Sequence, residues 1–561
     1  MKNKILYGFV LLMGVLAMAG CSDDSIVENP SGETFIYRMF IANGGLTGTD
    51  AIQGVIDEEA KTITFDAPAE TDIQAIKFTS KLSLGAHLDK ETYDFSQSNT
   101  IPVTVINGEN SSTYQVTINF DEPKETPIIT AVRVKLPNGT EKNAYVSEID
   151  KSIYMGAEEF ESVEILSISC LPKRTVTTLT MASNNVVQKS DPGSIELDFM
   201  GIKSEYRLLF AAIPVFGADF NKGVIYGYCN SLGNTFGDFV GENTRNADFD
   251  GENMLIMSRE GGINVRVIPF NEIKAGNPGG TSLNVDGIEK GTFLICAGRI
   301  SHGHYYVSNL TTGVSEDQPL KLYYWDNTSS QPQVLLEFLG AANGPEGEVD
   351  LSNLRFGDNL NVCLDENGNG YIFFVTQDGT TALRFTVTGF TTLENPTYLV
   401  PPTTLSYYAA VNQVPGKDNE YIVTSIQAGI YLTDANLTPI TVIDQDNIPI
   451  RCTDARVITF DNERYLITTS GRWTSWFKDD PQVFYIYDLS NGATTALAMM
   501  NLIADGAPQP LFTFTIGGDS PATYCSAPSA NTGWGIVDGK LCVMASATRA
   551  GFAIFEFPER E

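Results

Sequence analysis

The chain has 561 residues, with 68 acidic against 36 basic side chains and a formal net charge of −32. This charge disfavours nucleic acid and anionic lipid as partners, and it keeps a secreted protein soluble. The length predicts several domains, and 50 glycines between many short apolar runs predict a mostly β chain.

The first residues have the pattern of an export signal. Two lysines precede an apolar run over residues 5–18, and small residues precede Cys21. The apolar run is too short to cross a bilayer, which needs about 20 residues. We therefore expect a signal peptide over residues 1–20 and lipidation of Cys21, the first residue of the mature protein. The polar residues 21–33 are expected to form a flexible tether.

Strand patterns begin at Phe35, and residues 114–120 alternate with four apolar side chains on one face. We predict a β-sandwich over residues 34–122. Residues 128–213 read as a weak repeat of it, with Ile56-Asp57 echoed by Ile149-Asp150. Two tandem immunoglobulin-like sandwiches are the expected meaning.

Residues 220–561 repeat a strand, a turn rich in Asp, Asn and Gly, a second strand, and a third strand ending in aromatic residues. The turns before the second strands begin at Phe249, Val285, Leu364, Val414, Phe460 and Val537. Six such units predict a β-propeller. A count of seven follows if residues 223–229 and the C-terminal strand build a further blade together.

Loops between second and third strands share one face of a propeller with the connections between blades. We expect two long aromatic loops there, over residues 301–308 and 471–480. The candidate ligand-binding residues on this rim are His302, His304, Tyr305, Tyr306, Tyr407, Trp473, Trp476 and Phe477. Aromatic rings on a rigid scaffold suit sugars, whose C–H groups rest on a ring face. The alternative is that these rings pack between blades.

Metal, cofactor and catalytic patterns are weak. Asp365 opens a D-x-N-x-N-G run, but position twelve is Thr376 rather than glutamate, which favours a hairpin turn over a calcium loop. No zinc, Walker or nucleophile-elbow motif occurs, so we expect no cofactor and no metal. Cys296 and Cys542 lie in apolar runs and are expected to be small buried side chains.

The start Met18-Ala19-Gly20-Cys21-Ser22-Asp23-Asp24, with the strands at residues 62–65 and 114–118, resembles Bacteroidota surface lipoproteins that accompany polysaccharide-uptake systems. The acidic residues after Cys21 resemble the tag that sends such proteins to the outer face of the outer membrane. The resemblance implies that the sandwiches are spacers, that the ligand is a glycan, and that outer-membrane transporter components are further partners. A surface adhesion or scaffold protein is the first alternative. A propeller glycoside hydrolase, which needs only two suitably spaced carboxylates, is the second.

Overall fold

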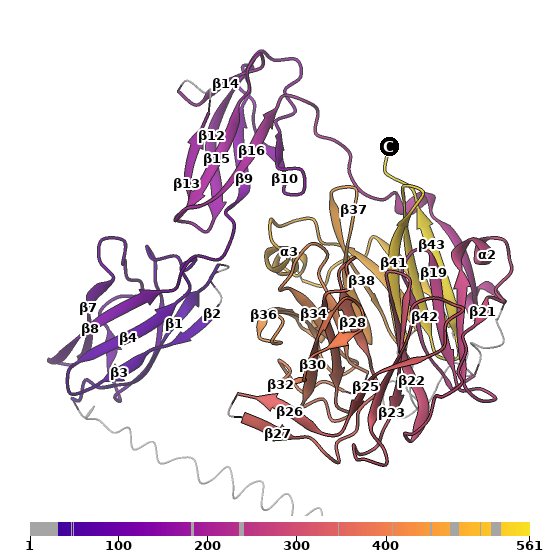
Figure 1. The fold of residues 1–561 in the computed structure, drawn as a ribbon. Helices are drawn as coiled ribbons and strands as arrows, with labels where there is room; N and C mark the ends of the chain where they lie inside the picture. The colour runs from indigo at the N-terminus through magenta and orange to yellow at the C-terminus, as the bar shows by residue number, and fades with distance from the viewer. Residues whose placement is uncertain are drawn as a thin grey trace, which may run out of the picture. The chain divides into compact units, whose positions relative to one another are not determined.

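The computed structural model describes residues 32–46, 48, 50–180, 184–234, 241–345, 347–406, 408–448, 451–471, 482–504, 506–517 and 529–561. These residues form two compact units, and strands dominate both (Figure 1). The N-terminal unit takes the described parts of Met1–Glu141 together with Ser162–Arg207, and the ring unit takes Lys142–Glu161 and Leu208–Glu561. The prediction of an all-β chain is confirmed. The described residues include no helix that is long and apolar enough to cross a membrane.

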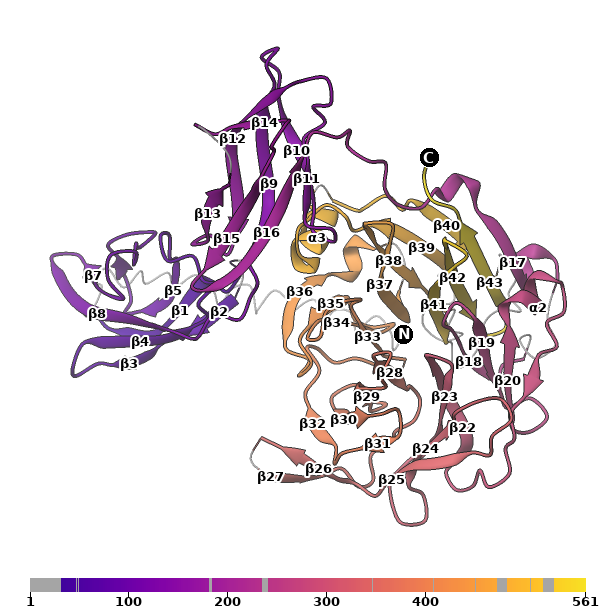
Figure 2. The same ribbon diagram turned by 45° about the horizontal axis from the view of Figure 1, so that its top comes forward.

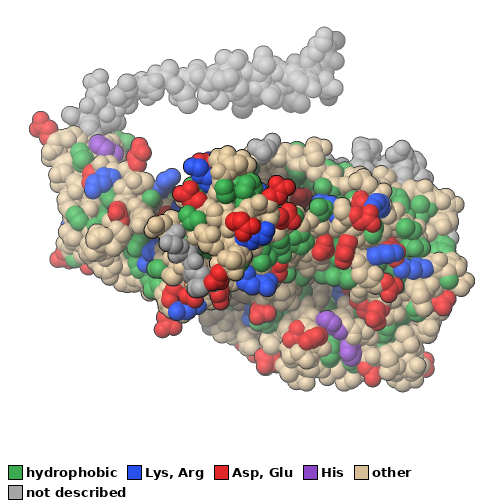
Figure 3. All heavy atoms as spheres, turned by 90° about the horizontal axis from the view of Figure 1, so that it is seen from above, with side chains coloured by type: hydrophobic (Ala, Val, Ile, Leu, Met, Phe, Trp, Pro, Cys, Tyr) green, Lys and Arg blue, Asp and Glu red, His purple; other side chains and the backbone are tan. Residues whose placement is uncertain are grey.

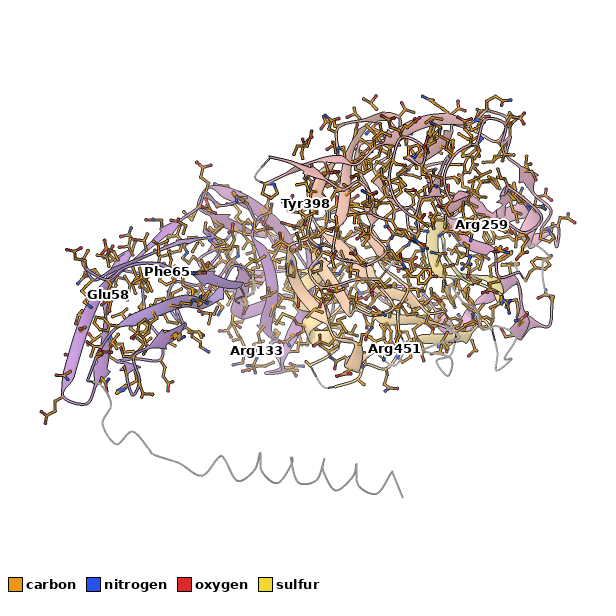
Figure 4. The ribbon with its side chains drawn as sticks, turned by 90° about the horizontal axis from the view of Figure 1, so that it is seen from below. Glu58, Phe65, Arg133, Arg259, Tyr398 and Arg451 are labelled. Carbon is orange, nitrogen blue, oxygen red and sulfur yellow. The ribbon has the colours of Figure 1, made fainter. Side chains whose placement is uncertain are left out.

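The first module of the N-terminal unit encloses one core between two sheets, of strand order β2-β1-β5 and β3-β4-β8-β7-β6. The strands are β1 (Ile36–Gly44), β2 (Asp50–Gln53), β3 (Val55–Asp57), β4 (Thr62–Ala67), β5 (Phe78–Leu82), β6 (His87–Leu88), β7 (Thr100–Asn107) and β8 (Asn110–Phe120). The alternation predicted for β8 is present, because Tyr114, Val116 and Ile118 are fully buried. Figure 4 labels Glu58 and Phe65 in this module.

The second module of the N-terminal unit is also built from strands. Here β12 pairs with β9 and β14, and β15 pairs with β13 and β16. The bounds are β9 (Ile128–Lys135), β12 (Ser162–Leu171), β13 (Val176–Leu179), β14 (Val186–Gln188), β15 (Ser194–Phe199) and β16 (Ile202–Leu209). The immunoglobulin-like identity of both modules stays a prediction.

A local motif recurs along the chain. Glu58 forms an ion pair with Lys61, and Lys61 has a left-handed φ of 53°. In the same way, Glu148 pairs with Lys151, whose φ is 51°. The spacing of three residues and the left-handed lysine are the same in both turns. Lys61 and Lys151 are also matched in the sequence comparison of the two segments, and the repeat itself stays a prediction.

In the ring unit, the described residues form six sheets with mostly antiparallel pairing, called blades one to six here in the order of their first strands. Blade one is β18 (Thr244–Phe249), β19 (Asn253–Ser258), β20 (Asn264–Pro269) and β21 (Thr281–Ser282). Blade two is β22 (Phe293–Ser301), β23 (His304–Leu310), β24 (Leu320–Trp325) and β25 (Gln333–Phe338). Blade three is β28 (Asn361–Leu364), β29 (Gly370–Val375) and β30 (Ala382–Thr388), extended by β31 (Thr392–Leu393), β32 (Thr397–Leu399), β26 (Ala341–Gly344) and β27 (Gly347–Asp350).

Blades four to six complete the ring. Blade four is β33 (Ala410–Gln413), β34 (Tyr421–Thr424), β35 (Ile430–Thr433) and β36 (Pro439–Ile443). Blade five is β37 (Asp454–Phe460), β38 (Glu463–Thr469), β39 (Val483–Asp488) and β40 (Phe512–Thr515). Blade six is β41 (Ala530–Val537), β42 (Lys540–Ala547), β43 (Gly551–Phe557) and β17 (Val224–Cys229). The unit also contains the hairpin strands β10 (Glu141–Ser147) and β11 (Ser152–Tyr154) and the helices α2 (Phe270–Lys274) and α3 (Thr495–Leu502).

The first strands of the six blades contact one another in a closed cycle around the ring's central channel (Figure 2). The ring closes where β17 pairs with β43, so one strand from before the blades completes the last one. The predicted propeller-like architecture is therefore confirmed. Residues 223–229 and the C-terminal strand share blade six, and the described residues form no seventh blade.

Blade two differs from the prediction made for it. Residues 293–301 are its first strand, not the end of its second, and His302-Gly303 is the tight turn into β23. Consequently the segment 301–308 is not a long loop between second and third strands. The prediction that Cys296 and Cys542 are buried is confirmed.

Candidate functional site

Polar side chains on the first strands line the central channel and join five of the six pairs of neighbouring blades among the described residues. On the first strands, the bridging side chains are Asn246, Asp248, Asn361, Asn412, Asp454 and Asn531. Asn246 Oδ1 accepts a hydrogen bond from the Gly298 amide at 3.1 Å, and Asn361 Oδ1 accepts one from the Val411 amide at 2.9 Å. Side chains that satisfy backbone groups of the neighbouring blade explain why polar residues are buried in this channel.

Arg456 lies at the centre of this network. Its Nη2 donates to Asp248 Oδ1 at 2.8 Å, and its Nε lies 3.8 Å from Asp454 Oδ2. Asp454 is fully buried and also accepts the Thr532 amide at 2.8 Å. Burial lowers the pKa of Arg456, but the two carboxylates outweigh it and the pKa is raised. The guanidinium is therefore held charged between blades one and five.

A cavity of about 880 Å³ opens where the first strands of the ring end. We call it the channel mouth. Its volume lies in the range of ligand pockets, about 300–1,000 Å³. Turns between first and second strands form its wall, and Asn412, Arg456 and Trp534 lie on the strands below. The titratable side chains of the wall are Asp250, Glu252, His302, Asp365, Lys417 and Asp418. The lining of the mouth is therefore mixed polar and apolar, has more acidic than basic side chains, and includes one indole ring.

The turns of the channel mouth are fixed by their own carboxylates. Asp250 Oδ1 accepts the amides of Glu252 and Asn253 at 3.0 and 2.8 Å. Burial raises the pKa of Asp250 despite these bonds. Asp365 Oδ1 likewise accepts the amides of Asn367 and Asn369, both at 2.8 Å. Its pKa is lowered, chiefly by the Asn369 bond. The predicted hairpin-turn role of the Asp365 motif is thus present, and the wall has a defined shape before any ligand arrives.

Glycines allow blades one and six to meet at the mouth. A Cβ on Gly535 would lie 2.5 Å from the Gly251 Cα, and one on Gly533 would lie 2.7 Å from the Phe249 amide nitrogen. Neither position has room for a side chain. Gly251 also has a φ of 101°, which an L-residue rarely adopts. Trp534 lies between these two glycines of β41, packs against the core of blades five and six, and lines the mouth.

Among the predicted rim residues, the structure places one at this mouth. His302 is exposed in the first turn of blade two, with Nε2 hydrogen-bonded to the Leu364 carbonyl at 3.1 Å. It joins blade two to blade three, the junction that the first-strand side chains leave unbridged among the described residues. His302 therefore has a bracing role beside any contact with a ligand.

The other three residues of that segment pack inside the ring. His304 Nδ1 is 2.6 Å from the Tyr324 hydroxyl, and its ring stacks 3.9 Å from that of Phe390. Burial lowers its pKa. Tyr305 is 4% and Tyr306 0% exposed. Their expected place on an open rim is wrong, because both are part of strand β23 and fill the space between blades.

Trp473, Trp476, Phe477 and Tyr407 lie outside the described residues, as does Cys21. Their predicted roles stay predictions. The described residues contain no group of three His, Cys, Asp or Glu side chains arranged for a metal ion.

The family comparison covers most of the chain. A family model described as "Domain of unknown function (DUF4623)" matches residues 24–138 and 203–560. This chain belongs to the DUF4623 family. A crystal structure of a DUF4623 family protein from Bacteroides eggerthii is 25% identical, with a TM-score of 0.54, and the match covers 94% of this chain and 99% of that one.

More distant structures match this DUF4623 chain weakly. A functionally unknown protein from Desulfotomaculum acetoxidans is 11% identical, covering 54% of this chain and 81% of that one, with a TM-score of 0.30. The WD40 domain of Toxoplasma gondii coronin is 11% identical, covering 62% of this chain and 90% of that one, with a TM-score of 0.31. A comparison with curated proteins gives no match.

The site residues of this DUF4623 chain that sequence reasoning missed are Asp250, Glu252, Asp418, Arg456 and Trp534. Two features of the sequence could have indicated these residues. Each acidic residue sits in an Asp/Asn/Gly turn already assigned to a first-to-second strand connection, and those turns share one end of a propeller. Trp534 carries a different signal, since a tryptophan between two glycines on a strand indicates close packing on one side and open space on the other.

Proposed function

We propose that this DUF4623 chain is a lipid-anchored surface protein whose ring unit binds a neutral glycan at the channel mouth. The observation that carries the proposal is the 880 Å³ cavity with polar side chains and Trp534 in its wall. Carboxylates and amides accept and donate hydrogen bonds to sugar hydroxyls, while an indole face supports the apolar face of a sugar ring.

Charge favours a neutral ligand over an acidic one. The mouth has four carboxylates and two basic side chains, Lys417 and Arg456. Arg456 is already paired with two buried aspartates, Asp248 and Asp454. A polyanionic glycan would meet repulsion here. Acidic side chains are also scattered over the face shown in Figure 3.

The export signal, Cys21 and the acidic residues after it support anchoring on the outer face of the outer membrane, and the matching family member from a Bacteroides species agrees with that setting. In this proposal the two N-terminal modules are spacers. Outer-membrane transporter components are the proposed protein partners.

The test is retardation of the soluble form, residues 31–561, in gels that contain single neutral polysaccharides. Trp534→Ala should weaken binding at least tenfold, and Trp534→Phe should retain most of it because a ring face remains. Tyr37→Ala removes an aromatic ring that is 55% exposed in the N-terminal unit, and it should bind as the parent does.

A double variant tests the aromatic residues of the predicted loop over residues 471–480 against the mouth. If Trp473→Ala with Trp476→Ala abolishes binding while Trp534→Ala does not, the glycan binds elsewhere than the mouth. Retardation by none of the polysaccharides, with co-purifying protein instead, favours the scaffold alternative. Release of sugar products favours the hydrolase.

A further inference from the structure

The end of the channel opposite the mouth contains a concentration of arginines. Arg245 lies near the start of β18, Arg259 follows β19, Arg299 is on β22, and Arg355 precedes β28 (Arg259 is labelled in Figure 4). They come from three successive blades. Asp358 is the carboxylate among them, and its Oδ1 and Oδ2 accept both donors of a bidentate bond from Arg355 at 2.5 and 2.7 Å.

Two of these guanidiniums have donors without a partner. Arg299 is 4% exposed; its Nη1 makes long bonds of 3.4 Å to Asn246 Oδ1 and the Gly298 carbonyl, and its buried Nε has no acceptor among the described residues. Arg259 stacks 3.9 Å over the Phe293 ring, and within the same described residues its buried Nε and Nη1 have none either. Buried donors without acceptors are unfavourable, and more so when they are charged.

Charge is reversed here relative to the whole protein. At this end of the channel, four arginines (Arg245, Arg259, Arg299 and Arg355) lie with one aspartate, Asp358. The chain overall has 68 acidic and 36 basic residues. Burial lowers the pKa of Arg259, and the nearby Arg245 charge adds to that effect. A bound anion would offset both the desolvation and the repulsion.

A cavity of about 20 Å³ lies within this cluster. Its lining includes the donor side chains Arg245, Arg299, Asn246, Asn359, Tyr408 and Asn531, together with the carboxylate of Asp358, which is already paired with Arg355. The space is enough for a group about the size of one water molecule. A planar carboxylate can enter by its edge and match a planar guanidinium in two parallel bonds.

We propose that this end of the channel is an anion-binding subsite that takes a single carboxylate group, either of a small free acid or at the tip of a larger ligand. Arg245 and Arg299 bind its oxygens, and Arg259 supplies long-range attraction. The subsite is separate from the channel mouth, and its test does not depend on glycan binding at the mouth.

The experiment measures thermal unfolding of the soluble form, residues 31–561, at constant ionic strength. Sodium acetate and sodium chloride are titrated as free anions, and sodium galacturonate is compared with neutral galactose. Acetate and galacturonate should raise the melting temperature saturably, as expected for a ligand that binds the folded state. Chloride and galactose should not. A larger effect of galacturonate than acetate assigns the carboxylate to a larger ligand, and equal effects assign it to a free acid.

The variants are Arg245→Gln, which changes a residue that lines the cavity, and Arg259→Gln, which changes a residue beside it. If Arg245→Gln fails to fold, Arg259→Gln still tests the proposal. Both should weaken the response at least tenfold. Arg266→Gln on β20 of the same blade makes the same charge change away from the channel and should respond as the parent does. Trp534→Ala should also keep the anion response, which distinguishes this site from the mouth.

Three results would overturn the proposal. These are no saturable response to any carboxylate, an unchanged response in both cluster variants, or an equal response to chloride, which would assign the site to a halide.

Discussion

Asp454 shows at the scale of one residue how the channel is held together. It is fully buried, and its carboxylate bonds to Asn412 Nδ2 at 2.7 Å and to the Thr532 amide at 2.8 Å. Asp454→Ala leaves Arg456 without one of its two carboxylates and should destabilise the ring unit by about 3–5 kcal/mol in urea unfolding. Asp317→Ala, in an exposed turn of the same unit, should change stability by less than about 0.5 kcal/mol. Equal effects of the two would contradict the bracing role.

Glu556 makes a pH-dependent contribution. Burial alone would raise its pKa, but hydrogen bonds from Lys274 and Lys540 outweigh burial and hold the pKa below its ordinary value of 4.5. Because the folded pKa is depressed, the stabilisation is present above pH 4.5 and lost as the pH falls through the folded pKa. Glu556→Gln should therefore cost about 1–2 kcal/mol at pH 7, a figure reduced by the exposure of Lys540. The difference from the parent should shrink below pH 4.5 in denaturant titrations at each pH, and a constant difference would refute the assignment.

At the scale of the element, β17 is the strand that closes the ring. It pairs along six residues with β43. Its removal would leave β43 as the unpaired edge strand of blade six. A fragment of residues 214–561 should melt cooperatively by circular dichroism. A fragment of residues 231–561 should aggregate or lose its cooperative transition. Two fragments with the same melting curve would show that blade six is stable with three strands.

Strand patterns allowed most of the ring to be predicted, and blade two shows where they did not. The run 293–297 is apolar and Gly298 follows it, so it could be read as a second strand ending at Cys296. Its register is set by the His302-Gly303 turn, where both residues have positive φ, 50° and 78°. An X-Gly pair between two strands is a two-residue hairpin signal, and histidine is among the residues that tolerate this φ.

The mouth and the arginine cluster could not be predicted from the sequence for a different reason. Asp248, Arg299 and Arg456 lie in three strands more than fifty residues apart, and each reads locally as a polar position in a half-exposed strand. Only the closed ring brings them to one channel. Turn residues such as Asp365 were recognisable because their hydrogen bonds are local.

At the scale of the whole molecule, two compact units with separate cores predict two unfolding transitions. Unfolding enthalpy grows with chain length, about 0.7 kcal/mol per residue, so the longer ring unit should give the larger calorimetric peak. Asp454→Ala should shift that peak alone. Ile118→Ala, which removes a fully buried side chain from the first module, should shift only the smaller peak. Carboxylate binding should likewise move only the ring transition. A single peak that both variants shift together would mean that the units unfold as one, and each ΔΔG would then describe the entire chain.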